Sequence, residues 1–436
     1  MSGAGPAREE ALAALTLIRE GMAAADALQK RAVARGLSPN DRALMAQLVY
    51  GVLRQRRYLD AWIRTLRRGP LDPVVEDILR LGFFQLGFLS RMPAYAVVHA
   101  TVELAKGVQP GAAGLVNAIL RRGHGHPPRD LPLAVRYSHP DWLVERWRGR
   151  FGDRVEAILQ ADNEVPPLTL RVNRLAADRK AVLSRLAERG VEANPSPYVP
   201  EAVRVVDSLW LENFPAFRAG WVSVQDESGM LVTWVLDPHP GDRVLDLAAG
   251  LGSKTTHILE RLGGEGRVWA VDRSARRLGL LAENCRRLGL RGWETVAADG
   301  RQVASRFATP FDRVLLDAPC SGLGVLRRRV DARWKRVEAD LARHQRLQRE
   351  LLAAAAEAVR PGGVVVYSVC SFEPEETEAV VAGALEAGLP LAVESVAPYL
   401  PHPELESALV GPYLRILPGE FGMDGFFVAR LRRVGR

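Results

Sequence analysis

Hydrophobic residues in the first third of the chain recur every three or four positions, which is the period of an amphipathic helix. Around Leu44, Leu48 and Val52 this run follows Ser38-Pro39-Asn40-Asp41, a segment with the serine, proline and acid of a helix start. Residues 1–137 are therefore predicted to form a compact all-α bundle. Further periodic runs span 74–89, 95–106 and 114–122, and the breaks between them fall at Gly69-Pro70, Pro93 and Pro110-Gly111.

A stretch rich in Gly, Pro and His at 123–132 reads as a linker, and beyond it the pattern becomes mixed. Helical runs and short extended runs then follow one another, so residues 138–223 are predicted to form a small α+β module. The predicted elements are helices at 141–151, 154–162 and 178–189 and strands at 168–172 and 203–206.

From residue 224 onward short β-branched runs alternate with helices. Such alternation predicts a parallel, doubly wound sheet in residues 224–436, with ligands bound at the carboxyl ends of its strands. A helix is expected after each of the first four strands. The five predicted strands span 243–247, 267–271, 294–297, 311–316 and 363–368.

The composition is that of an ordinary globular protein, with 47% hydrophobic and 25% charged residues. No stretch approaches the roughly 20 consecutive apolar residues that span a bilayer. The N-terminus carries acids early and lacks a basic start followed by an apolar run, so no signal peptide is expected. A cytoplasmic location without a membrane partner is the default expectation, and we expect a monomer.

The net charge of +8 attracts polyanions, of which nucleic acid is the commonest. Arginine clusters at 54–57, 64–68 and 121–122 lie near the ends of predicted helices. An RNA contact competes here with two plainer interpretations, a solvated helix face and a generally basic proteome.

The chain has three cysteines, Cys285, Cys320 and Cys370. Their number is odd and none forms a CxxC pair, so neither a disulfide framework nor a zinc site is indicated, and no metal is expected. If these cysteines serve a function, they serve it as thiols.

The first strand of the C-terminal region runs into the loop DLAAGLGSKT, residues 246–255. Small residues in a strand-to-helix turn let the backbone approach a ligand, and the helix N-terminus favours an anion such as a carboxylate. A Walker A loop would need glycine directly before the lysine, where Ser253 stands. A GxGxxG fingerprint fails as well, because Gly250-Leu251-Gly252 is followed by Ser-Lys-Thr.

Four acids, Asp246, Asp272, Asp299 and Asp317, follow four successive strands. Each alone is more often a cap or turn residue, but four at one sheet edge favour a cofactor that contains adenosine. An acid after the second strand, Asp272, suits both ribose hydroxyls. Asp299 is placed to meet an adenine edge.

Cys320 and Cys370 follow the fourth and fifth strands, which brings both thiols to the sheet edge that carries the cofactor loop. The competing interpretation is that each is a small buried hydrophobe. Methyl transfer to carbon 5 of cytosine gives two such thiols a purpose. Addition of a thiolate at carbon 6 makes carbon 5 nucleophilic, Asp317 is placed to protonate N3, and a second thiol assists elimination.

The motifs resemble those of the RNA 5-methylcytosine methyltransferase family, in its bacterial RsmB (Sun/Fmu) branch. The catalytic region matches in VLDLAAGLGSKTTHI, FDRVLLDAPCSGLGVLRRRVDARWK and VVYSVCSFEPEETEAVV, and in the shorter AADGR and the closing DGFFVA. The helical region, with NDRALMAQLVYGVLR and GLVNAILRR, is similar to a NusB-type RNA-binding domain. The resemblance covers essentially the whole chain, least distinctively in the middle module.

The resemblance implies a multidomain protein with an all-α NusB-like N-terminal domain, a small α+β middle module and a Rossmann-like class I methyltransferase domain. Cys370 would be the nucleophile, Cys320 the thiol that assists product release, and Asp317 a contact to both ring and cofactor. The implied substrates are S-adenosylmethionine and small-subunit (16S) ribosomal RNA. The implied cofactor site comprises Ala248, Ala249, Gly250, Leu251, Gly252, Ser253, Lys254, Asp272, Asp299 and Asp317.

The cofactor loop departs from the family pattern, which usually reads A-A-P-G-G-K-T. Leu251 replaces the usual proline and lacks its fixed φ, so a looser loop is expected. Ser253 replaces a glycine, which matters only if that position needs a positive φ.

Two alternatives remain open. The motifs specify a reaction but not the RNA on which it acts, so the same chemistry could act on transfer RNA or another ribosomal cytosine. A chain with this fold could also be a non-catalytic RNA-binding factor in ribosome assembly, for which the altered loop is the support.

Overall fold

The computed structural model describes residues 3–206, 209 and 211–435. The chain forms two compact units, and it crosses from one to the other more than once. The first unit comprises Met1–Glu164 with Leu326–Arg336, and the second comprises Val165–Val325 with Val337–Arg436. The division into domains at 137 and 223 stays a prediction.

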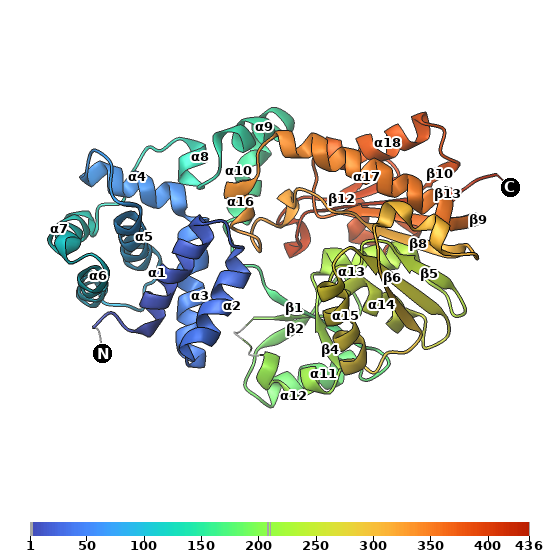
Figure 1. Ribbon diagram of the computed structural model, residues 1–436, viewed down its shortest axis with the longest axis horizontal. Helices are drawn as coiled ribbons and strands as arrows, with labels where there is room; N and C mark the ends of the chain where they lie inside the picture. The colour runs from blue at the N-terminus through green and yellow to red at the C-terminus, as the bar shows by residue number, and fades with distance from the viewer. Residues whose placement is uncertain (1–2, 207–208, 210, 436) are drawn as a thin grey trace. The chain divides into compact units, whose positions relative to one another are not determined.

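Helices build the first unit, as the hydrophobic spacing predicted. Helix α3 (Pro39–Arg54) begins at the expected cap, where the Ser38 side chain accepts a hydrogen bond from the Asp41 amide. Fully buried side chains such as Leu48 and Phe83 form one apolar core across these helices. The others are α1 (Pro6–Arg19), α2 (Ala24–Arg35), α4 (Arg56–Leu66), α5 (Pro73–Phe88), α6 (Ala94–Val108), α7 (Ala113–Gly123), α8 (Leu133–Arg136), α9 (Asp141–Phe151), α10 (Val155–Ala161) and α16 (Ala332–Lys335) (Figure 1).

The second unit begins with a small antiparallel sheet in the order β2-β3-β1-β4. Strand β1 (Leu168–Val172) lies between β3 (Ala202–Val205) and β4 (Val222–Val224), and β2 (Ala193–Pro195) is at the edge. Helix α11 (Arg179–Ala187) shares an apolar core with this sheet. The predicted α+β character of this region is therefore confirmed.

A nine-stranded sheet forms the rest of the second unit. The five predicted strands pair in parallel in the order β9-β8-β5-β6-β7. Their bounds lie close to the prediction: β5 (Arg243–Asp246), β6 (Arg267–Asp272), β7 (Trp293–Ala297), β8 (Phe311–Asp317) and β9 (Val359–Val369).

The predicted parallel strands are joined at the C-terminal edge of the sheet by strands that the sequence analysis did not predict and that pair antiparallel. Strand β13 (Phe426–Arg433) pairs antiparallel with β9, and β12 (Tyr413–Ile416) and β10 (Leu391–Glu394) pair antiparallel with β13. The sheet is therefore mixed. A helix was also expected after β7, but only two short 3-10 turns, Gly300–Gln302 and Ala304–Arg306, precede β8.

Helices cover both faces of the large sheet (Figure 1). On one face α13 (Glu227–Leu236), α14 (Ser253–Arg261) and α15 (Ala275–Arg287) share an apolar core with the strands. On the other face α17 (Ala339–Ala358) and α18 (Glu378–Glu386) share a second core. This layering leaves the carboxyl ends of the parallel strands to loops, where the predicted site residues lie.

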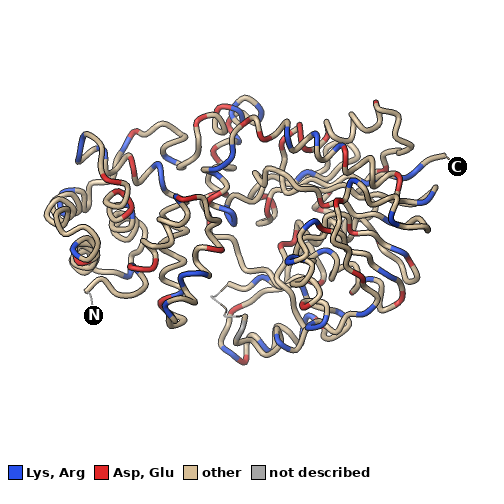
Figure 2. Tube along the Cα trace, viewed as in Figure 1, with Lys and Arg blue, Asp and Glu red and all other residues tan. Residues whose placement is uncertain are grey.

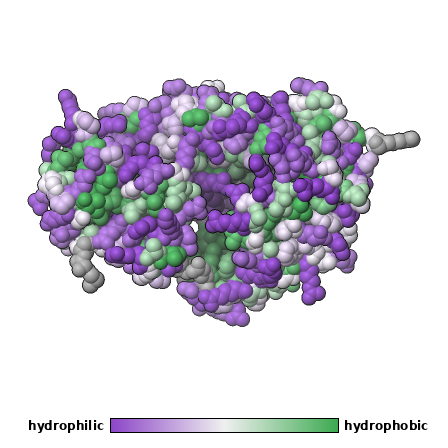
Figure 3. All heavy atoms as spheres, viewed as in Figure 1, coloured by the Kyte–Doolittle hydropathy of each residue, from purple (hydrophilic) through white to green (hydrophobic). Residues whose placement is uncertain are grey.

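Charged residues of both signs are interspersed along both units (Figure 2). Hydrophilic residues dominate the face seen in Figure 3, with smaller apolar patches between them. Within the described residues, no helix has the length and apolar character needed to cross a membrane.

Candidate active site

The loop between β5 and α14 is a tight turn that depends on two glycines. Gly250 and Gly252 adopt φ of 57° and 83°, a region that favours glycine. A Cβ at Gly252 would lie 2.3 Å from Leu281 Cγ. Ser253 is the first residue of α14 and is not among the non-glycine residues with positive φ, so its replacement of a glycine needs no strained backbone.

Hydrogen bonds from the second strand fix this loop. The Gly250 amide donates to Asp272 Oδ2 at 3.0 Å, and the Ala249 amide donates to the Val271 carbonyl at 2.9 Å. Gly252 is the N-cap of α14 and supplies no side-chain acceptor to its first turn. The helix therefore presents its positive end to the loop, and its N-cap residue contributes no acceptor there.

Asp246 and Asp317, at the ends of β5 and β8, differ sharply in their surroundings. Asp246 is fully buried, and one of its oxygens accepts from Thr255 Oγ1 at 2.6 Å while the other has no partner among the described residues. Burial raises the pKa of Asp246 to about 7. Asp317 is half-buried and accepts from Lys254 Nζ at 2.6 Å and from Ser368 Oγ at 2.9 Å.

Asp299 follows β7 and has a neighbouring arginine as its partner. Its carboxylate accepts from the Arg301 guanidinium at 2.6 and 3.0 Å, and this pairing lowers the pKa of Asp299 to about 2. Asp299 also caps the 3-10 turn at Gly300–Gln302 through the Arg301 amide. Its contact with an adenine ring stays a prediction.

The loops after β8 and β9 bring two thiols together, although 50 residues separate them in sequence. Cys320 Sγ and Cys370 Sγ lie 3.2 Å apart and share a hydrogen bond. This bond, together with burial, raises the pKa of Cys320 well above its usual value. Either sulfur can donate in this hydrogen bond, and the raised pKa of Cys320 favours the neutral thiol form of that residue.

Lys254 connects the cofactor loop to the thiols. Its ammonium pairs with Asp317, and negative charge on Asp317 and Cys370 raises the pKa of Lys254 despite its burial. The cation in turn stabilises a thiolate at Cys370. The sequence indicated Lys254 only as part of the cofactor loop, because a pairing across 63 positions leaves no local signal.

Glu376 is a site residue that the sequence reasoning missed. It is fully buried in the turn after β9, and it accepts from Ser321 Oγ at 2.5 Å and from Ser371 Oγ at 2.6 Å. These serines directly follow the two thiols, so one carboxylate fixes both loops. The acids of the segment EPEE, 373–376, were the available signal.

The remaining cysteine, Cys285, lies on α15 and is fully buried in the core that this helix shares with the sheet, and burial raises its pKa to about 12. It is packing. Within the described residues, no three His, Cys, Asp or Glu side chains gather in a way that could hold a metal.

Comparisons with known proteins identify the family of this chain. A family model described as 16S rRNA methyltransferase RsmB/F matches residues 233–432. The ferredoxin-like domain of RsmF/B-like methyltransferases matches 139–210, and the NusB family matches 6–124.

Relatives match along the full length of the chain. Probable ribosomal RNA small subunit methyltransferase B of Bacillus subtilis is 34% identical over 98% of this chain and 99% of its own. The ribosomal RNA small subunit methyltransferase B of Pectobacterium atrosepticum is 36% identical over 91% and 92%. Among solved structures, PH0851 superposes with a TM-score of 0.82 at 26% identity, covering 98% of both chains. The chain therefore belongs to the RsmB/F family of 16S rRNA methyltransferases, with a NusB-like helical region, a small middle domain and a Rossmann-like methyltransferase fold.

Proposed function

We propose that this protein transfers a methyl group from S-adenosylmethionine to carbon 5 of a cytosine in small-subunit ribosomal RNA, with Cys370 as the nucleophile. The observation that carries the proposal is the pair of thiols 3.2 Å apart at the sheet edge that carries the donor loop. The raised pKa of Cys320 favours its thiol form, and the Lys254 cation interacts electrostatically with Cys370.

The residues of the loop fit the donor. The uncapped first turn of α14 suits the donor's carboxylate, and Asp272 stands at the end of the neighbouring strand, where acids bind ribose hydroxyls. The free oxygen of Asp246 adds a buried acceptor beside this loop. When bound, S-adenosylmethionine supplies an electrophilic methyl group on a positively charged sulfur.

Cys370 acts first in the proposed reaction. Its sulfur adds to carbon 6 of the ring, which places an electron pair on carbon 5. Carbon 5 then takes the methyl group from the donor's sulfur, which keeps the electron pair of the broken bond. Solvent water removes the proton from carbon 5, and the electron pair of that carbon–hydrogen bond expels the Cys370 sulfur from carbon 6 and restores the aromatic ring. Asp317 contacts the N3–C4 edge of the base, and Cys320 assists the elimination. The base must leave its stack for carbon 6 to be reached.

The choice of RNA rests on the family and on the NusB-like region. Both relatives described above carry the name ribosomal RNA small subunit methyltransferase B. Bisulfite sequencing of total RNA from a deletion strain tests the choice, and complementation with Cys370→Ala is the control. We expect one 16S cytosine to lose its mark and the variant not to restore it. Loss of a transfer RNA mark with ribosomal RNA unchanged would assign the same chemistry to another RNA.

A non-catalytic assembly factor is the remaining alternative. The strain-free position of Ser253 removes part of its support, because the altered loop keeps a regular helix start. Calorimetric titration with S-adenosylmethionine separates the two. Absence of binding up to millimolar donor, with RNA binding intact, would favour the scaffold.

A further inference from the structure

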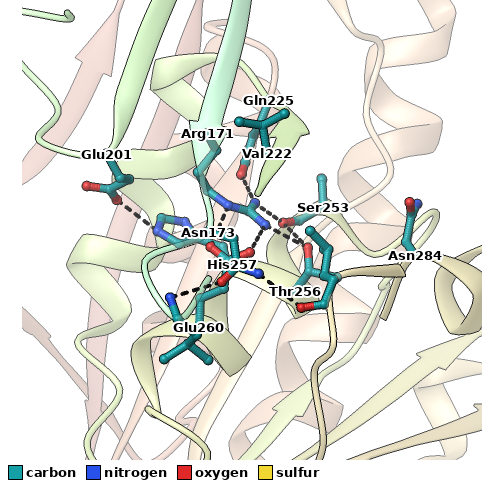
Figure 4. A network of polar contacts seen from close by, with 12 residues as sticks. Arg171, Asn173, Glu201, Val222, Gln225, Ser253, Thr256, His257, Glu260 and Asn284 are labelled. Carbon is teal, nitrogen blue, oxygen red and sulfur yellow. Dashed lines mark hydrogen bonds and ion pairs between the residues drawn. The ribbon is translucent and has the colours of Figure 1, made fainter. Parts of the chain in front are cut away.

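Arg171 is a fully buried arginine in β1, the central strand of the small sheet. Burial of a guanidinium is costly unless each of its N–H groups finds an acceptor. All five N–H groups of Arg171 have an acceptor. The acceptors lie in α14 and in the segment that directly follows β4 of the small sheet (Figure 4).

The acceptors of Arg171 are arranged along the start of α14. Nη1 donates to the Ser253 carbonyl at 2.7 Å, and Nη2 donates to Thr256 Oγ1 at 2.9 Å. Glu260, one turn further, accepts from Nε at 3.0 Å and from Nη2 at 2.7 Å. The planar fork of one side chain therefore holds three successive points on the first two turns of this helix.

The last N–H bond ties this network to a second helix. Nη1 also donates to Gln225 Oε1, directly before the Asp226 N-cap of α13. Figure 4 shows Arg171 between Gln225 and the Ser253–Thr256–Glu260 side of α14. One residue of the small sheet therefore bonds to the starts of both α13 and α14.

The hydrogen bond to the Ser253 carbonyl connects Arg171 to the active site. The carbonyl that Arg171 holds belongs to the residue between Gly252, the N-cap, and Lys254, which pairs with Asp317. A shift of the start of α14 would move the Lys254 ammonium away from the thiols. The same shift would displace the amides of the first helical turn. Displacements of about 1 Å can lower catalytic rates by about 100-fold.

We propose that Arg171 is a positioning residue for the methyl-donor loop, through which the small middle sheet sets the place of Lys254 and of the α14 N-terminus. Arg171 touches neither donor nor base; it acts through the Ser253 carbonyl. This inference rests on the proposed use of S-adenosylmethionine at that loop.

The test compares Arg171→Lys with Arg430→Lys in the full-length protein. Lysine keeps the charge but cannot make the five forked hydrogen bonds. Arg430 is a matched control because it is also almost fully buried in the second unit, where it bonds Glu394 and the carbonyls that end α13. Three quantities are measured: the donor Kd by calorimetry with S-adenosylmethionine, the KM for each substrate, and the Tm.

Arg171→Lys is expected to raise the donor Kd and the donor KM at least tenfold while the KM for RNA changes less than twofold. Arg430→Lys should lower Tm and leave the donor Kd unchanged. Equal losses of Tm in both variants with a wild-type donor Kd would overturn the inference. If Arg171→Lys does not fold, Thr256→Val is tested instead, because this variant removes one acceptor and keeps the arginine. A wild-type donor Kd for Thr256→Val would also overturn the inference. Failure of the wild-type protein to bind the donor would instead overturn the proposed function.

Discussion

Cys320 and Cys370 are identical side chains whose electrostatic surroundings differ. Cys320 has its pKa raised by the thiol–thiol hydrogen bond and by burial, and Cys370 lies within the field of the Lys254 ammonium. We therefore expect the electrostatic environment of the two sulfurs to decide which one attacks.

Cys320→Ala should therefore separate the two roles. Removal of this thiol leaves Cys370 able to add to the ring but slows the elimination, so RNA incubated with the donor should stay covalently attached to the protein. The attachment is measured on denaturing gels, with Cys370→Ala as the control that forms no adduct. An adduct with Cys370→Ala and none with Cys320→Ala would reverse the two roles.

Asp246 makes stability depend on pH in an unusual direction. Its pKa in the folded protein is about 7, above the value of about 3.9 for a free aspartate. Between these values the folded state binds more protons than the unfolded state, so the free energy of unfolding falls as pH rises toward 7. Asp246→Asn removes this dependence and can still accept from Thr255. The variant should gain Tm relative to wild type between about pH 5 and about pH 8, by differential scanning fluorimetry. A constant difference across that range would contradict the raised pKa.

At the scale of elements, the site depends on a close approach between two loops. Gly324 follows the Cys320 loop and Gly425 precedes β13, and the Gly425 amide donates to the Gly324 carbonyl at 2.8 Å. The Gly324 amide in turn donates to the Cys370 carbonyl at 3.0 Å. The missed antiparallel strand is thus what closes the site from the C-terminal side.

Gly324→Ala tests this contact. Its Cβ would stand 2.2 Å from the Gly425 carbonyl oxygen, so backbone must move. We expect a loss of about 1–3 kcal/mol in the free energy of unfolding, by analogy with overpacking, and a lower kcat because the Cys370 backbone shifts. Gly279→Ala is the control, since its Cβ meets nothing within 4 Å on α15, and it should be neutral or slightly stabilising. Equal behaviour of the two variants in denaturant unfolding would refute the account.

The parallel strands were predictable because they are short apolar runs, most of them next to a helical stretch, and their ends determined where Asp317, Cys320 and Cys370 lie. The reversal of β13 was not predictable, because strand direction depends on pairing with β9 and leaves no local signal. The same holds for Glu376 and Arg171, which act through partners distant in sequence. Local patterns predicted where the strands end and which side chains follow them, but not the contacts that position those side chains.

At the scale of the whole molecule, the segment after the Cys320 loop belongs to the first unit. Arg333 in this segment is almost fully buried and donates to the carbonyls of Arg54, Ser138 and Asp162. Arg54, one of the arginines considered for RNA contact, donates to the Arg327 carbonyl at 3.0 Å. Part of the basic cluster at 54–57 therefore has a structural role.

Arg333→Ala should destabilise the first unit. It leaves several buried carbonyls without donors, at about 1–3 kcal/mol for such a group, so the Tm of that unit should fall by several degrees in calorimetry. Lys106→Ala removes a largely exposed ion pair with Glu103 in the same unit and should leave the Tm almost unchanged. A wild-type Tm for Arg333→Ala would show that the segment is not part of that fold.

Nucleoside mass spectrometry tests the central claim most directly. Small-subunit ribosomal RNA lacking the modification is incubated with the purified protein and S-adenosylmethionine that carries an isotopically labelled methyl group, then digested to nucleosides. The account predicts labelled 5-methylcytidine with the wild-type protein and none with Cys370→Ala. Label on a ring nitrogen or a ribose oxygen, or undiminished 5-methylcytidine with Cys370→Ala, would contradict it.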